Sequence, residues 1–246
     1  MRSRFLSELT PADVVTLGNV VIGFLAVVIA PTDPEFAARL VLLAAVADGI
    51  DGVLARAFGG SDMGPYLDSL ADVPSFAIAP AMIVFVVGQD LDVGGPGWVD
   101  GFVLLGVPAV FVALAVLRLG AYSAYDTAAT RTVGAPTTLA ATIIAVSMLT
   151  VHWTPDLVVL GTAVLAIAMI APVSYPDLLA RDALIMGVIH VLAVAVPRAY
   201  GRVFPYALLT LAVAYLLLGP HFYWGETERR LRQPPKGKRS KGDRVE

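Results

Sequence analysis

Residues 48–72 read DGIDGVLARAFGGSDMGPYLDSLAD and place four aspartates in a chain that is otherwise strongly apolar. Long apolar stretches lie on both sides, VVTLGNVVIGFLAVVIA at 14–30 and FVLLGVPAVFVALAVL at 102–117. An ionised carboxylate is costly inside a bilayer, so such residues usually have partners and mark functional sites. The four are Asp48, Asp51, Asp68 and Asp72. The sequence therefore predicts a polar site built into membrane helices.

The composition is that of an integral membrane protein. Of the 246 residues, 57% are hydrophobic and only 15% are charged, against about 25% charged in soluble domains. The mean hydropathy is +0.77. No cysteine is present, which excludes disulfides and cysteine-based metal sites. We expect membrane lipid, and no nucleic acid, among the partners.

Eight apolar segments predict an all-α, polytopic membrane protein with about eight transmembrane helices. A simple span needs about 20 residues, and the last four segments are short by this measure. The segments are 14–30, 36–57, 65–87, 99–119, 136–151, 157–171, 183–196 and 203–218. We expect residues 1–225 to form one transmembrane domain. Residues 226–246 are polar and basic, and we expect a disordered tail there.

Lysine and arginine placement predicts the orientation, because cytoplasmic loops carry an excess of both. With eight spans and both termini inside, 14 of the 17 basic residues lie on the cytoplasmic side. The exceptions are Arg39, Arg198 and Arg202. This predicts a multi-pass protein of the cell membrane with the aspartates at the cytoplasmic face. The tail either fixes this topology as a solvated segment or also contacts anionic headgroups.

The spacing of the aspartates predicts that they cluster. Asp48 and Asp51 share one helix face, as do Asp68 and Asp72, and the short turn AFGGSDMG (57–64) joins the two helices. An antiparallel pair would bring the carboxylates together at one end of the bundle. Four carboxylates need a compensating charge, and Mg²⁺ and Mn²⁺ prefer oxygen ligands. Spacing alone leaves an ion-coupled transporter open as an alternative.

A longer pattern surrounds the aspartates. It is Asp48-x2-Asp51-Gly52-x2-Ala55-Arg56-x7-Gly64-x3-Asp68-x3-Asp72. This pattern resembles, at all eight fixed positions, the signature of the CDP-alcohol phosphotransferase family. The resemblance implies that the aspartates hold a pair of divalent metal ions and a cytidine diphosphate. It also implies that an acceptor hydroxyl displaces CMP from a CDP-linked lipid, and that the protein is a homodimer.

Further stretches resemble the phosphatidylserine synthase and archaetidylserine synthase branch of that family. They are TLGNVVIGF (16–24), LDSLADVPSFAIAPA (67–81), LRLGAYS (117–123), VGAPTT (133–138) and APVSYP (171–176). Two positions depart from the family. Pro11-Ala12-Asp13 stands where Pro-Asn is usual, and Gly120-Ala121-Tyr122 stands where Arg-Phe-Asn is typical.

The resemblance implies roles for the residues of the pattern, and the ends of the later spans supply candidates for binding serine. Asp48, Asp51, Asp68 and Asp72 would be metal ligands, with Asp72 also the catalytic base. Residues that would bind the CDP-lipid are Asn19, Gly52, Ala55, Arg56, Ser61 and Gly64. Candidates for the serine carboxylate are Arg118 and Arg181, whose alternative reading is the positive-inside bias alone. Tyr175 is a further candidate, or else an interfacial aromatic anchor.

The predicted function is transfer of the lipid phosphate group from a CDP-linked lipid to the hydroxyl of L-serine, with release of CMP. The lipid would be CDP-diacylglycerol or, since the Ala- and Asp-rich composition is also typical of salt-loving archaea, CDP-archaeol. Glycerol phosphate or inositol phosphate as the acceptor is an alternative, and the ion-coupled transporter is another.

Overall fold

The structure is a computed structural model that describes residues 8–92, 97–126, 131–150, 154–176 and 180–222. Its first half contains α2 (Pro11–Ile29), α3 (Pro34–Phe58), α4 (Gly64–Asp72), η1 (Val73–Ile78), α5 (Ala79–Val87), η2 (Gly88–Asp90), α6 (Gly97–Ala121) and η3 (Tyr122–Asp126). Its second half contains β1 (Arg131–Val133), α7 (Thr137–Thr150), α8 (Pro155–Ile170), β2 (Ser174–Pro176), α9 (Ala180–Ala195), η4 (Ala199–Gly201) and α10 (Val203–Phe222). The predicted tail, 226–246, lies outside the described residues.

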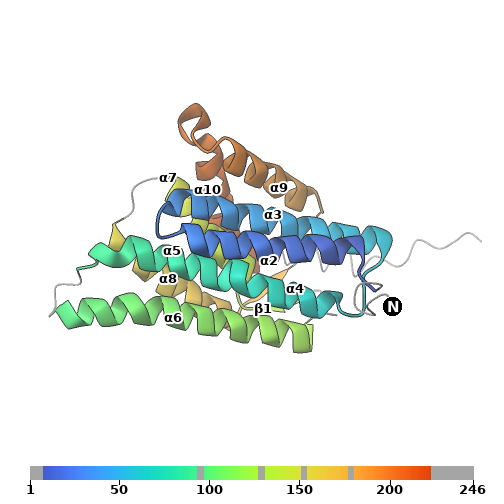
Figure 1. Ribbon diagram of the computed structural model, residues 1–246, viewed down its shortest axis with the longest axis horizontal. Helices are drawn as coiled ribbons and strands as arrows, with labels where there is room; N and C mark the ends of the chain where they lie inside the picture. The colour runs from blue at the N-terminus through green and yellow to red at the C-terminus, as the bar shows by residue number, and fades with distance from the viewer. Residues whose placement is uncertain (1–7, 93–96, 127–130, 151–153, 177–179, 223–246) are drawn as a thin grey trace, which may run out of the picture.

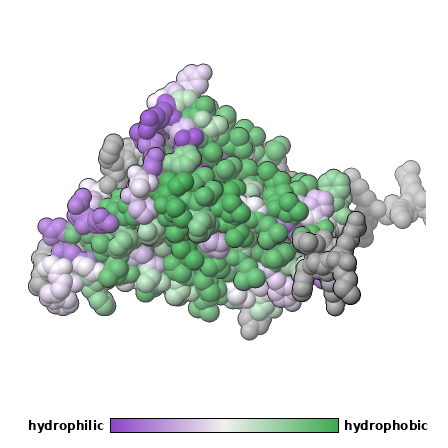
Figure 2. All heavy atoms as spheres, viewed as in Figure 1, coloured by the Kyte–Doolittle hydropathy of each residue, from purple (hydrophilic) through white to green (hydrophobic). Residues whose placement is uncertain are grey.

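The fold is a helical bundle in which α2, α3, α4–α5 and α6 run side by side along the long axis (Figure 1). Two apolar clusters hold it together. Leu42 and Phe76 belong to a cluster between α2, α3, η1 and α7, and Phe111 and Met169 belong to one between α5, α6 and α8. Large apolar side chains also remain exposed along the bundle, and Figure 2 shows them as a broad hydrophobic belt. This surface suits lipid rather than water as the surrounding solvent.

Each of the eight predicted segments falls on a helical segment, which confirms the helical architecture. Within the described ranges, four segments are long and apolar enough to cross a membrane: Pro11–Ile29, Gly64–Asp90, Gly97–Ala124 and Ala199–Pro220. The helix α3 has 25 residues but carries five charged side chains. The helices α7, α8 and the apolar part of α9 are shorter. A multi-pass membrane protein follows, while the count of eight crossings and the orientation stay predictions.

Local sequence signals set the helix ends near the aspartates. Thr10 caps α2 through a reciprocal pair of bonds with Asp13, and Pro11 begins the helix. At the other end of α3, Gly59 adopts φ +86°, a left-handed conformation that favours glycine, and the helix stops there. The N-terminus of α2, the C-terminus of α3 and α4 therefore meet at one end of the bundle (Figure 1).

The span predicted at 65–87 contains a π-helical turn, η1, directly after Asp72. Pro74 lies in this turn, and a proline lacks the N–H that an α-helix would use. The turn packs tightly against α2, since the Ser75 hydroxyl donates to both the backbone and side-chain oxygens of Asn19. A Cβ atom added to Gly23 would overlap Ser75. Glycine at 23 therefore permits the close approach of α2 and η1.

This contact gives a stability prediction. Gly23→Ala is expected to lower the free energy of unfolding by about 1–3 kcal/mol, because the added methyl group overlaps Ser75 in a packed interface. Gly18→Ala, in the same helix, meets nothing within 4 Å and should be neutral or slightly stabilising. Reversible unfolding in mixed detergent micelles measures both variants. Equal effects at the two positions would contradict the tight α2–η1 contact.

The bundle also contains a small sheet that the all-α prediction did not include. The strands β1 and β2 pair antiparallel, with Thr132 opposite Tyr175. The strand β2 lies within APVSYP, and β1 ends at Val133, the first residue of VGAPTT; the sequence marked both stretches only by resemblance. Extended pairing replaces helix here because the strands flank the α7–α8 hairpin and Gly134, at φ +82°, turns the chain against Met169.

The three arginines that violate the predicted charge asymmetry all bind protein acceptors. The Arg39 side chain donates to the carbonyl of Val194 near the end of α9. Arg202 donates to the carbonyls of Leu149 and Thr150 at the end of α7. Arg198 forms an ion pair with Glu35 at 3.0 Å. These contacts join α9 and α10 to α3 and α7.

Candidate metal centre and nucleotide site

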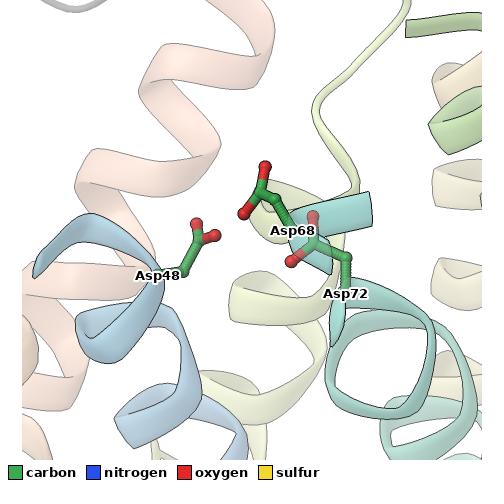
Figure 3. Close-up of side chains that lie close together, drawn as sticks. All are labelled: Asp48, Asp68 and Asp72. Carbon is green, nitrogen blue, oxygen red and sulfur yellow. The ribbon is translucent and has the colours of Figure 1, made fainter. Parts of the chain in front are cut away.

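Three of the four predicted aspartates converge between two helices. Asp48 comes from α3, while Asp68 and Asp72 come from α4, and their carboxylates face one another in Figure 3. One oxygen from each residue lies within 4.8 Å of the other two. The antiparallel arrangement of α3 and α4 produces this cluster, as the spacing predicted.

Asp51 occupies a different position from the other three. Its side chain is 6% exposed and accepts a hydrogen bond of 2.7 Å from the Thr16 hydroxyl on α2. The bond ties the carboxylate of Asp51 to the first helix, outside the three-residue cluster. Its role as a ligand stays a prediction, and Thr16 is the residue that fixes its orientation.

The cluster fits a hard divalent cation. All its donor atoms are carboxylate oxygens, the ligand type that Mg²⁺ and Mn²⁺ prefer. Asp72 is 8% exposed, and its Oδ1 atom is buried without a hydrogen-bond partner among the described residues. A buried carboxylate oxygen without a partner carries a large desolvation cost, which a bound cation would remove. Asp48, Asp68 and Asp72 can therefore hold a metal ion, whose identity and number stay predictions.

The predicted nucleotide residues lie along the same end of α3 and α4. The Arg56 guanidinium lies across Gly52, whose missing side chain leaves it room, with Nη1 3.5 Å from where a Cβ would stand. Ser61 and Gly64 form the turn that follows, closed by a bond from the Gly64 amide to the Ser61 carbonyl. On α2, Asn19 is fully buried, and its Nδ2 has no partner within the described part of the chain. Asn19 thus holds an unused donor one helical turn from Thr16.

The match to a family model covers this whole region. Residues 9–174 match the model described as CDP-alcohol phosphatidyltransferase. The chain belongs to the CDP-alcohol phosphatidyltransferase family. The signature aspartates, the nucleotide residues, β1 and the first residue of β2 fall within the matched residues. The resemblance inferred from the aspartate pattern is thereby confirmed.

Curated relatives carry two names within this family. The CDP-diacylglycerol–serine O-phosphatidyltransferase of Mycobacterium tuberculosis is 37% identical over 92 residues, which are 37% of this chain and 29% of the relative. Its namesake in Methanocaldococcus jannaschii is 38% identical over 78 residues, 31% and 36% of the two chains. The archaetidylserine synthase of Methanothermobacter thermautotrophicus is 29% identical over 142 residues, 56% and 57%. The matches thus span between about a third and just over half of these relatives.

The predicted acceptor residues of this family member have varied surroundings. Arg118 lies at the end of α6, 5.3 Å above the Tyr122 ring and 3.5 Å from the Thr137 hydroxyl, and it contributes to the electrostatic environment of Asp72. Tyr175 is buried, and its hydroxyl donates to the Leu216 carbonyl on α10. Burial raises the pKa of the Tyr175 hydroxyl, so it stays a donor at neutral pH. The side chain of Arg181 lies outside the described residues.

Sequence reasoning missed several polar contacts between the helices of the bundle. Asp13 was noted only as a departure from the family, yet it is 1% exposed and accepts a bond of 2.9 Å from the Ser61 hydroxyl. Ser69 on α4 is bonded to Ser123 in η3, beside Tyr122. Polar residues at buried positions of apolar helices were the available signal for Thr16 and Asp13, because buried polar groups require partners.

Proposed function

We propose that this transferase moves the lipid phosphate group of a CDP-linked lipid to the hydroxyl of L-serine and releases CMP. The carrying observation is the carboxylate cluster of Asp48, Asp68 and Asp72 within a complete family signature. The acceptor assignment is supported by the names of the curated relatives, all of which are serine or archaetidylserine enzymes. The lipid is CDP-diacylglycerol or CDP-archaeol, matching the two names.

In the reaction, the serine oxygen forms a bond to the lipid-bearing phosphorus, and the bond from that phosphorus to the CMP oxygen breaks. A divalent cation held by the aspartates would neutralise the pyrophosphate and stabilise CMP as the leaving group. Asp72 accepts the serine proton through the carboxylate oxygen that the cation does not occupy. Arg56 is placed to pair with a phosphate oxygen, because a guanidinium binds phosphate well.

Serine must also be oriented through its carboxylate. Arg118 is the supported candidate, since it lies at the end of α6 and acts electrostatically on Asp72. Arg181 and Tyr175 stay predictions. Since Arg118 acts electrostatically on the proposed base, a serine carboxylate bound to its guanidinium would bring the serine hydroxyl toward Asp72.

The alternatives are less well supported. A phosphorylated acceptor such as glycerol phosphate or inositol phosphate needs a dense cationic pocket, and among the side chains that the structure describes Arg118 and Arg56 are the cations at the ends of α6 and α3. An ion-coupled transporter would not require the full signature that the family model matches. A homodimer, and cytoplasmic placement of both termini and of the active site, remain predictions of the resemblance and of the charge distribution.

The acceptor is tested by offering alternatives separately. We expect CMP release from CDP-diacylglycerol or CDP-archaeol to depend on L-serine, with little release for glycerol 3-phosphate or inositol phosphate. The purified full chain in detergent, with Mn²⁺ or Mg²⁺ present, is assayed for CMP. Faster release with glycerol 3-phosphate than with serine would overturn the serine assignment while leaving the reaction class intact. No release with any acceptor would overturn the transferase activity.

A further inference from the structure

The Ser61 hydroxyl has a fixed direction, set by a buried carboxylate beneath it. Asp13 Oδ1 accepts the bond from Ser61, while Asp13 Oδ2 accepts from both the backbone N–H and the hydroxyl of Thr10, at 2.7 and 2.8 Å. Asp13 is 1% exposed, whereas Ser61 is partly exposed. A ligand in this corner therefore meets Ser61, and Asp13 acts only through it.

This arrangement decides which chemical groups Ser61 can bind. A hydroxyl has one proton and two lone pairs, and here the proton is directed to Asp13. Its remaining capacity is to accept. A phosphate oxygen is also an acceptor, so it cannot bond to Ser61 in this state, but an N–H group can. Gly64 keeps the pair accessible, since a Cβ there would stand 3.6 Å from Asp13 Oδ1 and 3.7 Å from Ser61 Oγ.

The position of Ser61 along the site points to the base of the nucleotide. In the proposed function, the pyrophosphate lies at Asp48, Asp68 and Asp72. Arg56 follows Asp48 by eight residues on α3, which is about 12 Å along the helix axis at 1.5 Å per residue. Ser61 lies beyond Arg56, in the turn that follows the helix. A nucleotide extended in this direction places its phosphates on the aspartates and its base at the turn.

We propose that Asp13 is a specificity-determining residue, which holds the Ser61 hydroxyl as an acceptor for the exocyclic amine of cytosine. Cytosine presents an N–H₂ donor at this edge, whereas uracil presents a carbonyl oxygen, an acceptor. Ser61 oriented by Asp13 bonds to the first and faces the second with a lone pair. The inference rests on the proposed use of a CDP-linked lipid. It adds a physical reason why the protein would bind cytidine nucleotides in preference to uridine nucleotides.

Asp13→Asn is the sharp test, because it reverses the hydrogen bond with little change in shape. An amide has one acceptor oxygen and one donor nitrogen. The two donors of Thr10 keep the amide oxygen of the new side chain on their side. The amide nitrogen then faces Ser61 and donates a hydrogen bond to its hydroxyl oxygen. The Ser61 proton is then directed outward, where it suits uracil. We expect the ratio of CDP affinity to UDP affinity to fall by about tenfold, the scale of one hydrogen bond.

The measurement is equilibrium binding of CDP and of UDP to the full chain in detergent with Mn²⁺, which needs no acceptor. Ser61→Ala should lower the same ratio by a similar factor, and adding Asp13→Asn to it should change the ratio no further. Asp33→Asn is the matched control, because Asp33 caps α3 through the Phe36 amide and is exposed. It removes the same charge at another helix start and should leave the ratio unchanged.

The outcomes separate this inference from the proposed function. A wild-type chain that binds CDP and UDP equally, or an Asp13→Asn variant that keeps the preference, overturns the role of Asp13. Additive effects of Asp13→Asn and Ser61→Ala also overturn it, because Asp13 would then act independently of Ser61. A cytidine preference that shifts as expected, in a chain that releases no CMP with serine, supports the inference and contradicts the acceptor assignment alone.

Discussion

CMP release by the purified protein is expected to fall to the background rate in EDTA and to return when Mg²⁺ or Mn²⁺ is added. The reason is the cluster of Asp48, Asp68 and Asp72, whose oxygens lie within 4.8 Å of one another and would repel the pyrophosphate unless a cation is bound between them. The effect should be close to complete, because the same cation would hold the substrate and stabilise the leaving group.

The measurement follows CMP from a CDP-linked lipid with serine present, before and after chelation. Removal of EDTA without added metal is the control, and it should leave the protein inactive. Full turnover in a metal-free preparation would contradict the metal centre. A comparison of Mg²⁺ with Mn²⁺ in the same assay would assign the preferred ion.

Asp72→Asn is expected to reduce serine-dependent turnover by about 10²-fold or more, the contribution of a positioned base. The amide keeps the size of the side chain and some capacity as a ligand, but it cannot accept the serine proton. Binding of the CDP-lipid should therefore stay within roughly tenfold of the wild type, since the amide oxygen can still act as a ligand. Affinity for the CDP-lipid and the rate of CMP release are measured across a titration of Mn²⁺.

Asp51→Asn is the matched comparison, with the same chemical change on the neighbouring helix. Asp51 is bonded to Thr16, and its predicted role is to hold the metal ions, so its loss should weaken nucleotide binding more than chemistry. Excess Mn²⁺ should then restore part of the activity. If extra metal restores Asp72→Asn equally well, Asp72 is only a ligand, and the proton must leave by another route.

The sequence predicted the helices and the cluster because both depend on short-range periodicity. Apolar segments of sufficient length specify membrane helices, and aspartates three and four residues apart specify shared faces. The short turn at 57–64 then leaves an antiparallel pair as the simple arrangement. Three carboxylates come together for these reasons, and no long-range information was needed.

The remaining features depend on contacts between distant segments. Thr16 lies 35 residues from Asp51, and Asp13 lies 48 residues from Ser61, so no periodic pattern links either pair. The strand pairing of Thr132 with Tyr175 joins segments on either side of two helices. From the sequence, Arg202 is only an exception to the predicted charge asymmetry. The structure shows its acceptors, two carbonyls at the end of α7.

The π-helical turn at Val73–Ile78 lets α4 and α5 face different neighbours, which one continuous α-helix could not do. An extra residue in a turn rotates everything after it by about 100°, the angle per residue of an α-helix. Asp68 and Asp72 can thus face α3, while Ile83 and Val84 are buried on faces set independently of theirs. The direction in which the side chains of α5 point therefore depends on the length of this segment. Deleting one residue from the turn would rotate α5 relative to α4, whereas replacing one apolar residue of the turn by another would not.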